Sequence, residues 1–181
     1  MEKEPLITRD KSLLVVIDMQ ERLVPAMAEP AKIVENTKRL LALAKIMDLP
    51  VIFTEQEKLG KTVEELSKEY PSPDPVSKIA FNCFLSEAFA SRVENTHRRT
   101  LIITGIEAHI CVAQTALSAY PRFEVHVAAD AISSRAPLNL HLALERMRAW
   151  GVTITSTEMV IYELLRKAGT DEFRAMLPLI K

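Results

Sequence analysis

"LLVVID", residues 13 to 18, is a run of five aliphatic side chains that ends in a carboxylate. A short, continuous apolar run of this kind is typical of a strand that is buried on both faces of a parallel sheet. The pattern recurs in "VIFT" (51–54), "LIIT" (101–104), "EVHVAAD" (124–130) and "VTIT" (152–155), and "VSKIA" (76–80) is a shorter candidate. The sequence therefore predicts a mostly parallel sheet of five or six strands.

Helical segments are expected between these strands. From 31 to 48 the apolar side chains recur at a spacing that puts them on one helical stripe, and four more segments have the same character: 84–97, 111–120, 138–150 and 157–168. Strands that alternate with helices form βαβ units with right-handed crossovers, which predicts an α/β fold, a doubly wound three-layer α/β/α sandwich. "YPSPDP" (70–75) is expected to be a loop, and "DEFRAMLPLIK" (171–181) a short helix.

Composition limits the class of protein. A chain of 181 residues that is 48% hydrophobic can bury one full core, so we expect a single domain over 1–181. The 23 basic and 24 acidic side chains are spread along the chain, which argues against nucleic acid or a membrane surface as the main partner. No apolar run approaches the roughly 20 residues that cross a bilayer. Two cysteines without a secretory apolar segment predict a cytoplasmic protein with free thiols.

Two candidate functional residues follow central strands. Ligands in open α/β sheets bind beyond the carboxyl ends of strands, where the strand order reverses. In the common order 3-2-1-4-5 the strands that precede Asp18 and Cys111 are neighbours, so both side chains would face one crevice. We expect Cys111 to open the helix "CVAQTALSAY", where the dipole and free N–H groups favour a thiolate and a developing oxyanion. The structural alternatives are a small buried hydrophobe for Cys111 and a loop cap for Asp18.

Four stretches carry a family resemblance. "LLVVIDMQERLV", "TEQEKLGKTVEEL", "SKIAF" and "TGIEAHICVAQTAL", in this order and spacing, resemble the isochorismatase-like cysteine hydrolases. The resemblance continues through "AADAISSR" and "STEMVIYELL", so it covers nearly the whole chain. The stretches "GIEAHICV" and "STEMVIYELL" are most similar to an uncharacterised branch of small-domain hydrolases that is related to the nicotinamidases.

The resemblance implies a catalytic triad of Asp18, Lys78 and Cys111. Asp18 would take the thiol proton and return it to the leaving group, Lys78 would support the charged pair, and Cys111 would attack a carbonyl carbon to form a thioester. The family also has a cis peptide shortly before the cysteine, which here would be the Ile106 to Glu107 bond. The N–H groups of Glu107 and Cys111 would then form the oxyanion hole.

The metal site of related nicotinamidases is not expected here. Those enzymes bind a metal through an aspartate and histidines after the second strand, whereas "FTEQEKLGKTVEEL" contains no histidine. We therefore predict no metal and no cofactor. His109 could line the pocket or cap a loop, and Gln20, Phe81 and Phe84 are candidates for substrate binding, although aromatic residues near a site also form core.

Other residues are expected to have structural roles. Cys83 is expected to be buried, and Asp130 and Arg135 to brace the loop after the fifth strand as an ion pair or cap. Four apolar residues near the end of the chain could form a subunit interface or pack inside one subunit: Val160, Ile161, Leu164 and Leu165.

The leading functional hypothesis is a metal-independent hydrolase of a small amide or related acyl compound. Cys111 favours acyl chemistry because nucleophilic attack requires the thiol. One alternative is an isochorismatase-type vinyl ether hydrolase, whose reaction proceeds by protonation and needs no thiol. Another is a non-catalytic oligomeric binding or thiol-sensing module. The expected partners are a small-molecule substrate and further copies of this chain, in a homo-oligomer.

Overall fold

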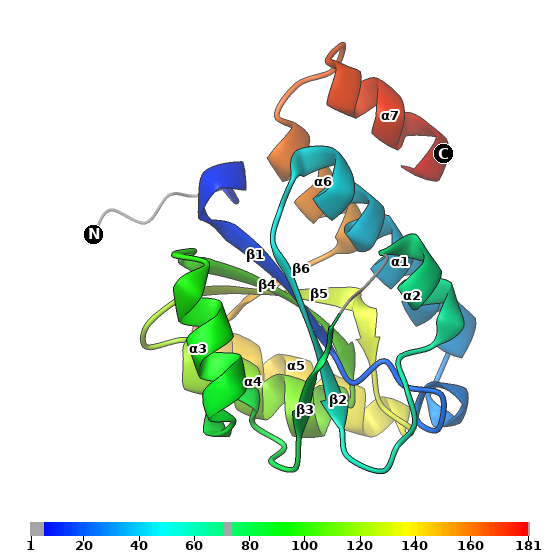
Figure 1. The fold of residues 1–181 in the computed structure, drawn as a ribbon, viewed down its shortest axis with the longest axis vertical. Coiled ribbons are helices and arrows are strands. Elements are labelled where there is room, and N and C mark those ends of the chain that lie inside the picture. Colours follow the sequence, from blue (N-terminus) through cyan, green and yellow to red (C-terminus); the bar gives the residue numbers. More distant parts are fainter. Residues whose placement is uncertain (1–5, 71–73, 181) are drawn as a thin grey trace.

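The sheet of the computed structural model, which describes residues 6–70 and 74–180, contains six parallel strands (Figure 1). The strands lie in the order β3-β2-β1-β4-β5-β6, which confirms the doubly wound topology with β1 and β4 at its centre. Their bounds are Ser12–Ile17 (β1), Val51–Gln56 (β2), Val76–Lys78 (β3), Thr100–Ile106 (β4), Glu124–Ser133 (β5) and Thr153–Thr155 (β6).

Helices cover both faces of this sheet and confirm the three-layer α/β/α sandwich. Figure 1 shows α1 and α6 on one face, with α7 outside them, and α3, α4 and α5 on the other face. The helices are Pro30–Met47 (α1), Glu64–Glu69 (α2), Glu87–Asn95 (α3), Ala113–Ala119 (α4), Pro137–Ala149 (α5), Thr157–Leu165 (α6) and Asp171–Ile180 (α7). The sequence did not predict α2. The predicted loop at 70–75 lies partly outside the described residues.

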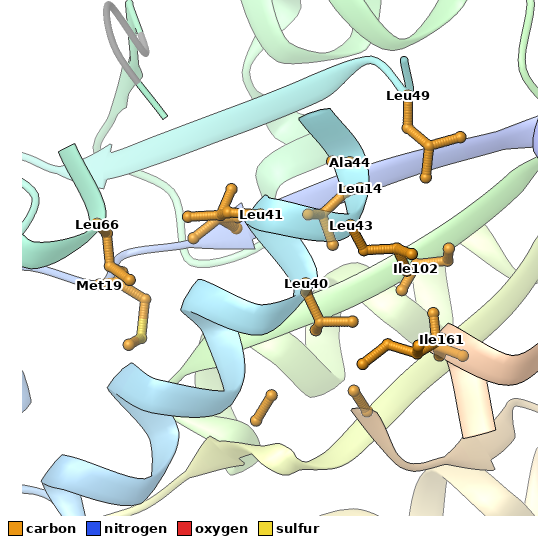
Figure 2. Close-up of a cluster of buried hydrophobic side chains, with 14 of the residues drawn as sticks. Leu14, Met19, Leu40, Leu41, Leu43, Ala44, Leu49, Leu66, Ile102 and Ile161 are labelled. Atoms are coloured by element: carbon orange, nitrogen blue, oxygen red, sulfur yellow. The ribbon is translucent and has the colours of Figure 1, made fainter. Parts of the chain in front are cut away.

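The first strand is apolar throughout because both of its faces are covered. Leu14 and Val16 join the core beneath α1 and α6, and Leu13, Val15 and Ile17 join the core on the opposite face. Figure 2 shows the first core, in which Leu14, Leu40 and Ile102 come from β1, α1 and β4. The four apolar residues of α6 belong to this core and are buried, so they pack inside the subunit and form no interface: Val160, Ile161, Leu164 and Leu165.

Two predictions about the chain after β4 are corrected by the structure. The fifth strand continues to Ser133, so Asp130 lies inside it, and its carboxylate accepts hydrogen bonds from the backbone N–H and hydroxyl of Thr157 at 2.7 and 3.0 Å. Asp130 therefore braces the start of α6, while Arg135 pairs with Glu107.

Of the helices in the described part of the chain, none is long and apolar enough to cross a membrane.

Candidate active site

Asp18 lies at the switch point, directly after β1. Its backbone has a φ of 51°, a left-handed conformation that aspartate tolerates better than most residues. The side chain is buried, and its two oxygens have different partners. Thr54 donates a hydrogen bond to Oδ1 at 2.7 Å, and Lys78 donates one to Oδ2 at 2.7 Å. The carboxylate is therefore held in one orientation by a neutral and a charged donor.

Lys78, the last residue of β3, brings a cation to the same place. Its ammonium donates to Asp18 Oδ2 and to Gln56 Oε1, at 2.7 and 2.9 Å, and lies 3.8 Å from Cys111 Sγ. The side chain has 0% exposure. Burial is the largest single effect and lowers the pKa of Lys78, but the Asp18 carboxylate together with Cys83 and Cys111 outweighs burial and holds this pKa above its ordinary value. Lys78 is therefore an ammonium that bridges the acid and the thiol.

Cys111 lies in a π-helical turn, Ala108–Val112, that precedes α4. The residue is 6% exposed, and burial followed by the nearby Asp18 carboxylate raises the pKa of its thiol to about 12, against the opposing effect of Lys78. This corrects two predictions: Cys111 does not open the α-helix, and the resting side chain is a protonated thiol and not a poised thiolate. Nucleophilic attack therefore requires that the proton leave as the sulfur reacts.

The chain reaches Cys111 through an unusual piece of backbone. Gly105 has a φ of 122°, and a Cβ at this position would lie 2.0 Å from the carbonyl oxygen of Ile17, its neighbour in β1. Only glycine permits this approach, which brings the ends of β1 and β4 together. The next peptide, Ile106 to Glu107, is cis, as predicted. The buried Glu107 carboxylate then accepts hydrogen bonds from the backbone N–H and Nε of Arg135 at 3.0 and 3.2 Å.

A cavity of about 120 Å³ opens onto the sulfur. It is lined by Asp18, Leu23, Gln56, Leu59, Phe81, Glu107, Ile110 and Cys111. The thiol and carboxylate thus meet at one small, mainly apolar pocket, with the lysine ammonium behind them. This arrangement can move a proton from sulfur to Asp18 and present the sulfur to a small electrophile.

Known proteins share this fold and sequence pattern. The isochorismatase domain model matches residues 12–159. The chain belongs to the isochorismatase family. It is 35% identical over 177 residues to the secreted isochorismatase effector Isc1 of Phytophthora sojae, covering 94% of this chain and 84% of that protein.

Two solved structures of isochorismatase-fold proteins superpose closely on the chain. The YcaC gene product of Escherichia coli, described as an octameric hydrolase of unknown specificity, has a TM-score of 0.91 and 28% identity over 99% of this chain and 91% of that one. YcaC from Pseudomonas aeruginosa, solved with hexane-2,5-diol and covalent acrylamide, has a TM-score of 0.90 and 26% identity over 99% and 93%. The chain is accordingly a hydrolase of the isochorismatase family.

The substrate-binding candidates fall into two groups. Phe81 lines the pocket and is 53% exposed. Gln20, Phe84 and His109 are absent from the lining within the described part of the chain.

Their contacts explain their positions. The amide of Gln20 is buried and donates to the carbonyls of Gln56 and Gly60, at 3.0 and 2.7 Å. Phe84 packs on Phe89 and Phe123 in the core. The ring nitrogens of His109 lie 2.8 Å from Ser134 Oγ and 3.4 Å from Asn139 Nδ2.

Sequence reasoning missed Gln56 as part of the site. Its Oε1 accepts a hydrogen bond from Lys78, and its Nε2 donates to the carbonyl of Ile79 at 2.7 Å. The signal was present in the strand pattern, since Thr54 and Gln56 are two residues apart and so lie on one face of β2. Strand register then pairs Gln56 with Lys78 in β3.

The carboxylate of Glu55, in β2, is engaged within the protein. Glu55 Oε1 accepts hydrogen bonds from the backbone N–H and hydroxyl of Thr62, at 2.7 and 2.8 Å. Over residues 6–70 and 74–180, no group of three or more His, Cys, Asp or Glu side chains is arranged to hold a metal ion.

Proposed function

We propose that this isochorismatase-family protein hydrolyses a small amide or related acyl compound through a thioester on Cys111. The observation that carries the proposal is the position of one ammonium, Lys78 Nζ, 2.7 Å from Asp18 Oδ2 and 3.8 Å from Cys111 Sγ beside the pocket. Each of the three residues, taken alone, can be explained by a structural role that involves no catalysis. Their convergence at the switch point of the sheet favours catalysis.

The first half of the reaction forms the acyl-enzyme. The thiol proton passes to the Asp18 carboxylate as Sγ attacks the carbonyl carbon, and the carbonyl oxygen becomes an oxyanion. The backbone N–H groups of Glu107 and Cys111 are the proposed donors to that oxyanion. Asp18 then gives its proton to the leaving amine, the C–N bond breaks, and a thioester remains on Cys111.

The second half returns the enzyme to its resting state. Asp18 takes a proton from water, and the hydroxide attacks the thioester carbonyl. The C–S bond then breaks to release a carboxylic acid, and Asp18 returns its proton to the sulfur, which regenerates the carboxylate and the Cys111 thiol. Lys78 keeps the Asp18 carboxylate oriented before each proton transfer, because its ammonium donates a hydrogen bond to Oδ2 at 2.7 Å.

We propose that this reaction needs no metal or cofactor. Lys78 already supplies the positive charge beside the reacting groups. Oε1 of Glu55 in β2 is bound to Thr62. These residues therefore fit a metal-free site better than they fit a metal site of the nicotinamidase type, which uses an aspartate and histidines.

Vinyl ether hydrolysis is the alternative within the family, and a non-catalytic binding or thiol-sensing module is the alternative outside it. Protonation of a vinyl ether needs an acid but no thiol, so a thiol placed beside the ion pair in the pocket favours acyl chemistry. A thiol sensor would need an easily ionised sulfur, whereas burial raises the pKa of Cys111 to about 12.

Activity assays with matched variants test the proposal. A panel of small amides is offered to the wild-type protein and to Cys111→Ala, Cys111→Ser and Asp18→Asn, with Cys83→Ala as the control cysteine variant. Turnover is expected to vanish in Cys111→Ala, to fall severely in Cys111→Ser and Asp18→Asn, and to persist in Cys83→Ala. Ordinary turnover by Cys111→Ala would overturn the covalent mechanism.

Self-association and location complete the proposal. The octameric state described for the E. coli relative supports a homo-oligomer for this chain, which light scattering coupled to size-exclusion chromatography tests directly. A monomer at micromolar concentration would contradict it. The cytoplasmic location and the absence of a nucleic-acid partner stay predictions.

A further inference from the structure

The charges around the pocket bear on which acyl compounds it accepts. Its apolar wall consists of Leu23, Leu59, Phe81 and Ile110, and its acidic groups are Asp18 and Glu107. Among the described residues that line the pocket, none is basic. A substrate carboxylate would therefore enter a cavity whose ionised walls carry its own sign of charge.

The two nearest cations are already engaged. The Lys78 side chain is fully buried behind the wall and is bound to Asp18 and Gln56. Arg135 is 65% exposed at its side chain, but its Nε contacts the Glu107 carboxylate at 3.2 Å. A ligand carboxylate could recruit the Lys78 ammonium only by breaking a charge-assisted hydrogen bond of the protein. Arg135 keeps further N–H donors, but it is not among the residues that line the pocket.

The polar side chain on the wall is also committed. Gln56 uses its oxygen to accept from Lys78 and its nitrogen to donate to the carbonyl of Ile79. One N–H of its amide is left, so this side chain could give an anion at most one hydrogen bond. A carboxylate placed beside these walls would lose its water without gaining an equivalent partner, which is costly in a buried site.

The size of the cavity restricts the acyl group as well. Its volume of about 120 Å³ is well below the roughly 300 Å³ at which drug-sized ligand pockets begin. A cavity of this size holds a small group with few heavy atoms beside the sulfur. The apolar wall favours a short hydrocarbon group among those atoms.

We infer that the pocket selects small, uncharged acyl compounds with a short hydrocarbon group and rejects those that carry a carboxylate next to the reacting carbon. This inference rests on the proposed function, because it assumes that Cys111 is the reacting group. It also counts against dicarboxylates such as isochorismate as substrates of this chain.

Two alkylating reagents of nearly equal size provide the test. Iodoacetamide is neutral and iodoacetate is anionic, and both react by the same step: an Sγ–CH2 bond forms, the C–I bond breaks, iodide leaves, and the thiol proton goes to Asp18. Rates at Cys111 are measured by peptide mapping at neutral pH. The ratio of the two rates is compared with the ratio for a short, unstructured cysteine peptide under the same conditions.

The expected ratio of iodoacetamide to iodoacetate is at least about tenfold higher at Cys111 than in the peptide, because only the neutral reagent avoids the charge and solvation penalties of the pocket. Phe81→Lys, at a half-exposed position of the wall, should lower the ratio about threefold or more by adding a cation. Phe81→Leu is the matched control, which should leave the ratio near that of the wild type.

The outcomes separate the inference from the function on which it rests. Fast labelling of Cys111 by both reagents, at the peptide's ratio, would overturn the substrate inference and leave the proposed function standing. If neither reagent labels Cys111 in the folded protein, both the substrate inference and the proposed function are overturned. A high ratio that falls in Phe81→Lys alone supports the inference, and the same contrast is then expected in turnover of isobutyramide over oxamate, which have the same number of heavy atoms.

Discussion

Replacing Lys78 by methionine tests how much the fold depends on its buried ion pair. The substitution keeps an unbranched side chain but removes the ammonium that lies 2.7 Å from Asp18 Oδ2. Both side chains have 0% exposure, so no water replaces the lost partner. Asp18 would retain the hydrogen bond from Thr54 to its other oxygen. The variant therefore holds a buried carboxylate whose remaining side-chain donors, the Thr54 hydroxyl and the Cys111 thiol, are neutral.

The expected cost follows from that geometry. Breaking a buried ion pair by removing one partner typically costs about 3 to 5 kcal/mol, because a charge is left without compensation. The remaining bond from Thr54 places the expected loss near the lower end, about 3 kcal/mol. Ordinary domains have about 5 to 15 kcal/mol of stability, so Lys78→Met should still fold. Adding Asp18→Asn removes the stranded charge and should restore about 2 kcal/mol.

Urea unfolding at pH 7, followed by circular dichroism and Trp150 fluorescence, measures these free energies. The control is Lys68→Met, which breaks the exposed pair of Lys68 with Glu64 and should leave the urea midpoint nearly unchanged. The reasoning would be refuted if Lys78→Met behaved like this control. It would also be refuted if the Asp18→Asn addition gave no recovery.

Two other variants test the cysteine environment and the junction of β1 with β4. Burial raises the pKa of Cys83 from 9.0 to about 11, so its contribution to stability is complete below about pH 9 and is lost as pH rises through 11. Between pH 8 and 10 the wild type should lose about 1 kcal/mol that Cys83→Ala does not lose, and parallel thermal-melting curves against pH would contradict this. Gly105→Ala should lower soluble yield and cost about 4 kcal/mol or more, because its Cβ would meet the Ile17 carbonyl at 2.0 Å. Gly169→Ala, also at positive φ but with open space around it, is the control, and equal losses would refute the steric argument.

The strands could be predicted from sequence because parallel strands are buried on both faces and read as unbroken aliphatic runs. "LLVVID" gave both the first strand and the carboxylate at its end, and the topology rule then placed Asp18 beside Cys111. Lys78 could be predicted as a site residue only through the family resemblance, since a lysine at the end of a three-residue edge strand has no distinctive local pattern. The cis peptide before Glu107 was likewise available only through that resemblance.

Other features depend on tertiary packing that a single sequence does not encode locally. The six-residue helix α2 is held by Leu66, which packs in the core beside α1. Phe81 and Phe84 look alike in sequence, yet one lines the pocket and the other stacks on Phe123. The protonated state of Cys111 follows from burial, which overrides the helix-terminus effect that its position in the sequence suggested.

Trapping the acyl-enzyme tests the central claim most directly. A substrate found in the amide panel is mixed with the protein, quenched in acid within milliseconds, and analysed by intact-mass spectrometry and peptide mapping. The account predicts an added acyl mass on the peptide that contains Cys111, its release at the rate of product formation, and no adduct on Cys83. Full turnover without any acyl mass on Cys111, or an adduct on another residue that turns over at that rate, would contradict it.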